Sequence, residues 1–91
     1  MKVRYTATAL RELNEILAYV AERNVGAAAA VRVRIENLVG QLSLFPFMAQ
    51  ETELIGVRRL PLGNFPYAIF YMVEGDEVVV LHVRHGARRP L

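Results

Sequence analysis

Apolar and polar residues follow two different periods along this chain. Residues 2–6 alternate in polarity, which is typical of a short strand. Over residues 9–23 and again over 27–44, apolar side chains recur every three or four positions, and this spacing predicts two amphipathic helices. The predicted buried stripes are Leu10, Leu13, Leu17 and Val20 in the first helix, and Val31, Ile35, Leu38 and Leu42 in the second.

The boundaries of the two helices carry recognisable signals. Thr6 and Thr8 are both candidate N-caps for the first helix, because a threonine hydroxyl can accept a hydrogen bond from a free backbone N–H. Asn24 and Gly26 mark the turn after it, and Pro46 ends the second helix. A link of two or three residues would force the two helices into an antiparallel hairpin.

A meander of three strands is predicted to follow. Residues 48–56 show no period and are interpreted as a loop, and strands are predicted over 57–62, 66–73 and 77–85, with tight turns between them. Both faces of the middle strand are apolar, which indicates a central strand. In the last strand, simple alternation places two sets on opposite faces: Val79, Leu81, Val83 and His85 on one, and Val78, Val80, His82 and Arg84 on the other.

The order β-α-α-β-β-β defines the expected fold class. It predicts an α+β protein whose helical hairpin packs on one face of a small antiparallel sheet, in a single domain over residues 1–91. The hydrophobic fraction is 54%, which is high for so small a core. We therefore expect an exposed apolar surface that serves a partner, in part on the sheet face that the helices leave open.

Composition excludes several kinds of chemistry. There is no cysteine, so disulfides, thiolate metal sites and a cysteine nucleophile are excluded. Two histidines alone do not make a zinc site, so neither a metal nor a cofactor is expected. No run of about 20 apolar residues is present, and the first residues lack a secretory pattern. We expect a cytoplasmic protein that does not enter the membrane.

The basic residues are nearly all arginine. The formal net charge is +2, and Lys2 is the only lysine among the 11 basic residues. Arginine offers a planar fork that suits phosphates and carboxylates. Residues 84–91 contain Arg84, Arg88 and Arg89 and no acid, which predicts a local basic patch.

Five segments in this order and spacing resemble the RelE/ParE toxin superfamily of type II toxin–antitoxin systems, and its ParE-like branch in particular. The segments are Tyr5-Thr6-x-x-Ala9-x-x-x-Leu13, Leu42-x-x-Phe45-Pro46, Gly56-Val57-Arg58-Arg59-Leu60-Pro61, Pro66-Tyr67-x-Ile69-Phe70-Tyr71-x-Val73 and Val83-x-His85-Gly86-x-Arg88. The resemblance implies a growth-inhibiting toxin, of the kind associated with plasmid stabilisation, that is neutralised by a cognate antitoxin. It also implies one of two targets. RelE-like members cut mRNA on the ribosome, whereas ParE-like members poison DNA gyrase.

The residues that RelE-like ribonucleases use are only partly present. An alignment by eye places the lysines of that pattern on Val57 and Arg59, its middle-strand arginine on Ala68 and its late arginine on Arg88. Its tyrosine has no counterpart among these 91 residues. His85 would match the late histidine of a related branch, and it also fits a strand-end histidine bonded to a backbone carbonyl. A ribonuclease would therefore use Arg59, His85 and Arg88.

Three hypotheses remain open at this stage. The leading one is a gyrase poison without catalysis, the second is a ribonuclease acting on mRNA, and the third is a domain that keeps only antitoxin binding. Alternation along the strand predicts that Arg58 and Arg59 point to opposite faces. The predicted target contacts are Arg58, Arg59, Arg84, Arg88 and Arg89. The predicted antitoxin contacts are Tyr19, Tyr67, Ile69 and Tyr71.

Overall fold

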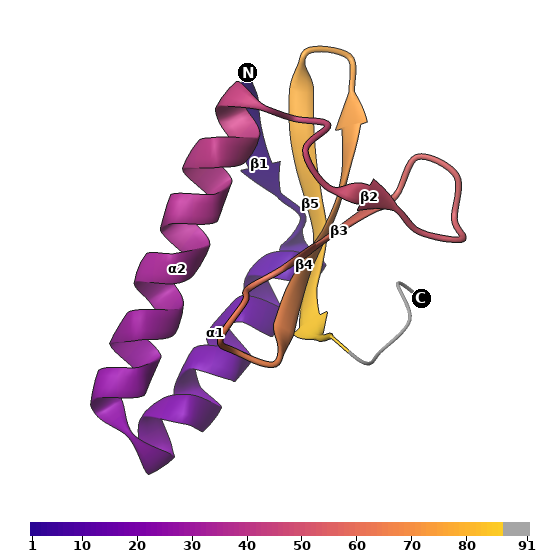
Figure 1. Cartoon of the computed structure of the whole chain (residues 1–91). Helices are drawn as coiled ribbons and strands as arrows, with labels where there is room; N and C mark the ends of the chain where they lie inside the picture. Colours follow the sequence, from indigo (N-terminus) through magenta and orange to yellow (C-terminus); the bar gives the residue numbers. More distant parts are fainter. Residues whose placement is uncertain (87–91) are drawn as a thin grey trace.

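A computed structural model describes residues 1–86, and Figure 1 shows two long helices beside one sheet. The elements are β1 (Lys2–Tyr5), α1 (Ala7–Arg23), α2 (Val25–Leu44), β2 (Gln50–Glu51), β3 (Arg58–Pro61), β4 (Tyr67–Glu74) and β5 (Glu77–His85). The predicted helical hairpin and meander are both present, and the α+β class is confirmed. None of the described helices is long and apolar enough to cross a membrane.

The sheet has the strand order β1-β5-β4-β3-β2 and is mixed rather than wholly antiparallel. β2, β3, β4 and β5 pair antiparallel, but β1 runs parallel to β5, with Val3 opposite Val78. The prediction of a wholly antiparallel sheet was therefore wrong in this respect. A four-residue strand carries no local signal for its partner, and β1 pairs with a strand more than 70 residues away. β2 lies within the predicted loop, because two extended residues are too few to show a period.

The caps explain where the helices begin. Thr6 is the N-cap of α1, as its Oγ1 accepts a hydrogen bond from Ala9 N–H at 3.0 Å. The alternative cap, Thr8, lies inside the helix. Asn24 alone links the helices: its N–H donates to the carbonyl of Val20, and its Oδ1 accepts from Ala27 N–H at 2.9 Å. The link is thus shorter than predicted.

The core lies between the helical hairpin and one face of the sheet. The predicted stripe of α2 is confirmed, since Val31, Ile35, Leu38 and Leu42 are all buried. The prediction for α1 was partly wrong: Leu10 is half exposed, and the fully buried residue on this part of the helix is Ala9. A small alanine adds little to an amphipathic pattern, yet it lets the helix approach the sheet closely.

A bulge in β5 shifts the faces of its second half. Tyr71 of β4 lies opposite Val80, but Phe70 lies opposite His82, so Leu81 is an extra residue in β5. Simple alternation was therefore wrong across this strand. Val83 joins Val78 and Val80 in the core beneath the helices, whereas His82 and Arg84 pair with Phe70 and Ala68 on the other face.

The expected exposed apolar surface exists, but it lies elsewhere than predicted. On the sheet face turned away from the helices, Ala68 and Phe70 are fully buried and Val79 is 3% exposed. Large exposed apolar side chains instead gather where α2 ends. We call this segment the apolar ledge, and it consists of Leu44, Phe45, Phe47 and Met48.

Candidate functional site

A cleft beside β2 and β3 contains Arg59, and we call it the Arg59 cleft. Its volume is about 580 Å³, and its lining includes Glu51, Glu53, Arg59, Phe70 and Gly86. Arg59 donates a hydrogen bond from Nη2 to the carbonyl of Gly86 at 3.0 Å. A Cβ on Gly86 would lie 2.8 Å from that Nη2, so the missing side chain leaves room for the guanidinium.

Arg58 lies on the opposite face of β3 and binds backbone carbonyls of the segment that precedes β2. It donates to the carbonyl of Ala49 at 2.5 Å and to that of Phe47 at 3.4 Å, and it pairs with Glu51 at 3.5 Å. Its guanidinium also lies 5.1 Å from the centre of the Phe47 ring. The prediction that Arg58 and Arg59 point to opposite faces is confirmed, since their β4 partners are Tyr71 and Phe70. These contacts give Arg58 a structural role.

The second cleft, the Tyr19 cleft, lies between α1 and the end of β5. It has a volume of about 370 Å³, and its lining includes Ile16, Tyr19, Tyr67, Val83 and His85. Tyr19 is 54% exposed. The ring of Tyr67 meets that of His85 edge-on, with 6.2 Å between the ring centres. Two predicted antitoxin contacts, Tyr19 and Tyr67, therefore come together in one cleft.

The other two predicted antitoxin contacts, Ile69 and Tyr71, are fully buried in the core. In this fold they are not surface residues, because the face of β4 that carries them lies under the helices. The Tyr71 hydroxyl accepts a hydrogen bond from Ala49 N–H at 3.4 Å, and burial raises the pKa of Tyr71. Tyr71 thus helps to fix the segment that also binds Arg58.

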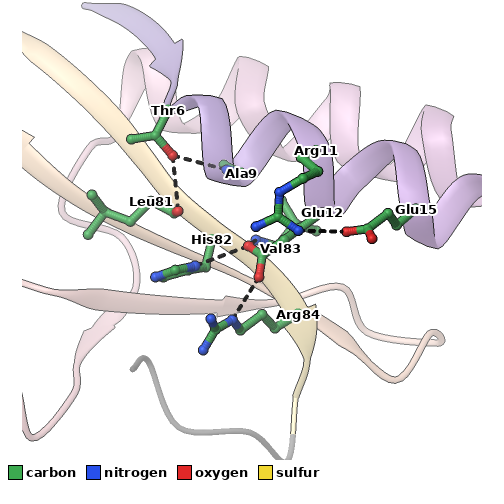
Figure 2. Close-up of polar contacts among 9 residues, drawn as sticks. All are labelled: Thr6, Ala9, Arg11, Glu12, Glu15, Leu81, His82, Val83 and Arg84. Carbon is green, nitrogen blue, oxygen red and sulfur yellow. Dashed lines mark hydrogen bonds and ion pairs between the residues drawn. The ribbon is translucent and has the colours of Figure 1, made fainter.

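A carboxylate on α1 binds three groups of β5, as Figure 2 shows. Glu12 Oε1 accepts a hydrogen bond from Val83 N–H at 3.2 Å and lies 3.0 Å from His82 Nδ1, while Oε2 accepts from Arg84 Nε at 2.9 Å. Because a carboxylate only accepts, this geometry requires the proton of His82 on Nδ1. We call Glu12, His82, Val83 and Arg84 the Glu12 cluster.

The Glu12 cluster is held firmly at the edge of the sheet. The Glu12 side chain is 14% exposed, and those of His82 and Arg84 are each 20% exposed. Burial alone would raise the pKa of Glu12, but the hydrogen bonds from Arg84, His82 and Val83 outweigh it and hold the pKa below its usual range. Arg84, a predicted target contact, is bound to Glu12, and the sequence pattern did not single out Glu12 at all.

The groups that a ribonuclease would use do not share a site. Arg59 lies opposite Phe70 and His85 lies opposite Tyr67, and these two β4 residues are three positions apart, so their side chains point to opposite faces. Arg59 lines one cleft and His85 the other. Arg88 and Arg89 lie outside the described residues. Within residues 1–86, no group of three acidic or histidine side chains could hold a metal ion.

Comparisons with known proteins agree with this architecture. Residues 3–90 match the family described as "ParE toxin of type II toxin-antitoxin system, parDE". The chain is 37% identical over 85 residues to the "Putative toxin Y4kP" of Sinorhizobium fredii, covering 93% of this chain and 88% of that protein. A solved structure titled "Chromosomal ParDE TA system from P. aeruginosa" has the same fold, with a TM-score of 0.68 at 23% identity, over 93% of this chain and 95% of that one.

These matches identify both the class of protein and the family to which the chain belongs. A β-α-α-β sequence of elements followed by a meander, matched over nearly its whole length, makes this a toxin of the type II toxin–antitoxin class. Within that class, the chain belongs to the ParE toxin family, whose members pair with ParD antitoxins.

Proposed function

We propose that this chain poisons DNA gyrase by binding it, without catalysis of its own, and that a cognate antitoxin neutralises it. The proposal rests chiefly on one observation: Arg59 and His85 line different clefts, and their side chains point to opposite faces of the sheet. It implies a cytoplasmic protein, since its target acts there.

The separation bears directly on the ribonuclease alternative. Cleavage of RNA needs a group that activates the 2′-hydroxyl and a cation that stabilises the same phosphate in the transition state. The strand positions of Arg59 and His85 direct their side chains to opposite faces of the sheet, and this arrangement argues against one phosphate held by both. The positions at which a RelE-like enzyme carries further cations hold Val57 and Ala68, and Ala68 is fully buried.

The Tyr19 cleft supports the proposed antitoxin contact. Arg23 packs on Tyr19, because it donates to the Tyr19 carbonyl at 2.9 Å and its guanidinium lies 3.7 Å from the ring centre. Tyrosine and arginine are the side chains that most often contribute strongly to protein interfaces. An antitoxin helix or strand that placed an apolar side chain beside Ile16 and Tyr67 would be anchored in this cleft.

The test compares the two target activities of the purified chain. We expect gyrase supercoiling to be inhibited, double-strand breaks to be trapped, and mRNA on ribosomes to remain intact. Cut mRNA with normal supercoiling would overturn the proposal, and loss of that cutting in Arg88→Ala would then support the ribonuclease. If the soluble chain affects neither process and does not slow growth, the third hypothesis, antitoxin binding alone, would take its place.

A matched pair of variants tests the proposed surfaces. Arg59→Ala should weaken gyrase inhibition, because this guanidinium lines the open cleft. Arg32→Ala removes an exposed arginine of α2 that does not line this cleft, so it should leave gyrase inhibition unchanged. Tyr19→Ala should weaken antitoxin binding and leave gyrase inhibition intact. Equal effects of Arg59→Ala and Arg32→Ala would mean that only net charge matters.

A further inference from the structure

We propose that the loop between β2 and β3, with Ile55 at its tip, inserts into an apolar pocket of the toxin's protein target. We call residues 52–57 the β2–β3 loop. Figure 1 shows it projecting from the sheet, clear of both helices. The inference rests on the proposed function, which names that target as gyrase, and it adds the part of the toxin that makes the contact.

Ile55 is unusual in how completely it faces solvent. It is 97% exposed, whereas the other large exposed apolar side chains among residues 1–86 range from 43% to 75%. Single exposed apolar residues are common on protein surfaces, so exposure alone does not define a site. The conformation and the surroundings of the loop supply the rest of the argument.

The loop is held in one conformation by its own hydrogen bonds. Thr52 N–H donates to the Val57 carbonyl at 2.7 Å, Val57 N–H to the Leu54 carbonyl at 3.0 Å, and Leu54 N–H to Thr52 Oγ1 at 3.1 Å. Gly56, with φ of 81°, adopts the left-handed conformation that turns the chain back. An apolar tip that is ordered before binding loses little conformational entropy when a partner covers it.

The loop and the apolar ledge are joined by an unbroken chain of contacts. Gly56 N–H donates to Glu51 Oε2 at 3.4 Å, Glu51 pairs with Arg58 at 3.5 Å, and Arg58 lies over the Phe47 ring at 5.1 Å from its centre. These contacts connect the β2–β3 loop to the segment that carries Phe47, which is 62% exposed.

Charge and shape select a folded protein as the partner. The β2–β3 loop contains no basic residue, so it offers no cation to the phosphates of DNA or RNA. A projecting side chain needs a concave pocket, and a single antitoxin helix or strand offers none. A folded protein with an apolar pocket fits both requirements. The loop also leads directly into β3, which carries the proposed target contact Arg59.

The decisive variant is Ile55→Asp, with Val25→Asp as its matched control, because Val25 is also largely exposed, at 75%. In the full chain we expect Ile55→Asp to bind purified gyrase at least about 30-fold more weakly and to lose growth arrest at equal expression. Ile55→Leu and Val25→Asp should behave like the wild type. Thermal unfolding of all variants should agree within about 2 °C, since the tip contacts little of the fold.

The outcomes separate this inference from the function on which it rests. Growth arrest by Ile55→Asp equal to that of the wild type would overturn the inference, and so would weaker antitoxin binding with growth arrest intact. A wild-type chain that arrests growth without acting on gyrase would overturn only the gyrase assignment, and loss of arrest in Ile55→Asp would still support the loop as the target contact. A wild-type chain that does not arrest growth would overturn both.

Discussion

The Glu12 cluster and the Arg59 cleft both place an arginine at the sheet, but they use it differently. Arg84 donates to a carboxylate that is nearly buried and already binds His82 and Val83. Arg59 donates to a backbone carbonyl, and within residues 1–86 it forms no ion pair with a carboxylate. Arg84 binds a nearly buried carboxylate and ties β5 to α1, whereas Arg59 lines an open cleft, where we propose that it contacts a partner.

The largest effect is expected from Glu12→Ala. This change removes the shared acceptor of three hydrogen-bonding groups at a largely buried position, so the free energy of unfolding should fall by about 3 kcal/mol. Urea denaturation measures it. Glu15→Ala on the same helix is the control, because that exposed pair with Arg11 contributes less than about 0.5 kcal/mol. Equal losses of unfolding free energy in both variants would show that the Glu12 cluster stabilises the fold no more than an exposed ion pair does.

The pH dependence of the unfolding free energy tests the contribution of Glu12 in a second way. The folded state holds the pKa of Glu12 below its usual range, so the unfolded chain binds the proton more readily. The stabilisation from Glu12 is therefore present above the unfolded pKa, about 4.3, and is lost as pH falls through the lower folded pKa. Urea denaturation between neutral pH and pH 3 should show a steeper loss for the wild type than for Glu12→Gln. Parallel curves would contradict the prediction.

A smaller effect is expected from Thr6→Ala. Thr6 Oγ1 accepts from Ala9 N–H and donates to the Leu81 carbonyl at 3.1 Å, so it caps α1 and ties it to β5 near the Glu12 cluster (Figure 2). Its loss should cost about 1–2 kcal/mol in the free energy of unfolding. Thr8→Ala is the matched control within the helix, and it should be neutral or slightly stabilising. The reverse order would mean that Thr8 is the true cap.

The smallest effect on stability, and the most informative for the Arg59 cleft, is expected from Gly86→Ala. Its Cβ would crowd Arg59 Nη2, the mobile end of a long side chain, so the unfolding free energy should change by less than about 1 kcal/mol. If the placement of Arg59 matters, gyrase inhibition should nevertheless weaken as it does in Arg59→Ala. Inhibition that is lost in Arg59→Ala and kept in Gly86→Ala would show that the charge acts without this geometry.

Much of the fold follows from local patterns. The stripe of α2, an N-cap at either Thr6 or Thr8 and the opposite faces of Arg58 and Arg59 were predictable, because periods of 3.6 and 2 residues and capping bonds operate within a few positions of one another. The five segments that resemble the toxin family are likewise short stretches of sequence. The sequence by itself therefore determined the order of the elements other than β2, the class of the fold and the family of the toxin.

Other features depend on residues that only the folded chain brings together. Glu12 meets His82 across 70 positions, and β1 finds β5 across the whole chain. The bulge at Leu81 places Val83 and His85 on the same face as Val78 and Val80, whereas simple alternation had put them on the opposite face. Arg59 and His85 line separate clefts. Strand register and long-range contacts depend on packing between segments that are far apart in the sequence. No local period in the sequence therefore predicts them. Tertiary structure therefore decided which arginine is bound, which tyrosines are buried and where the apolar surface lies.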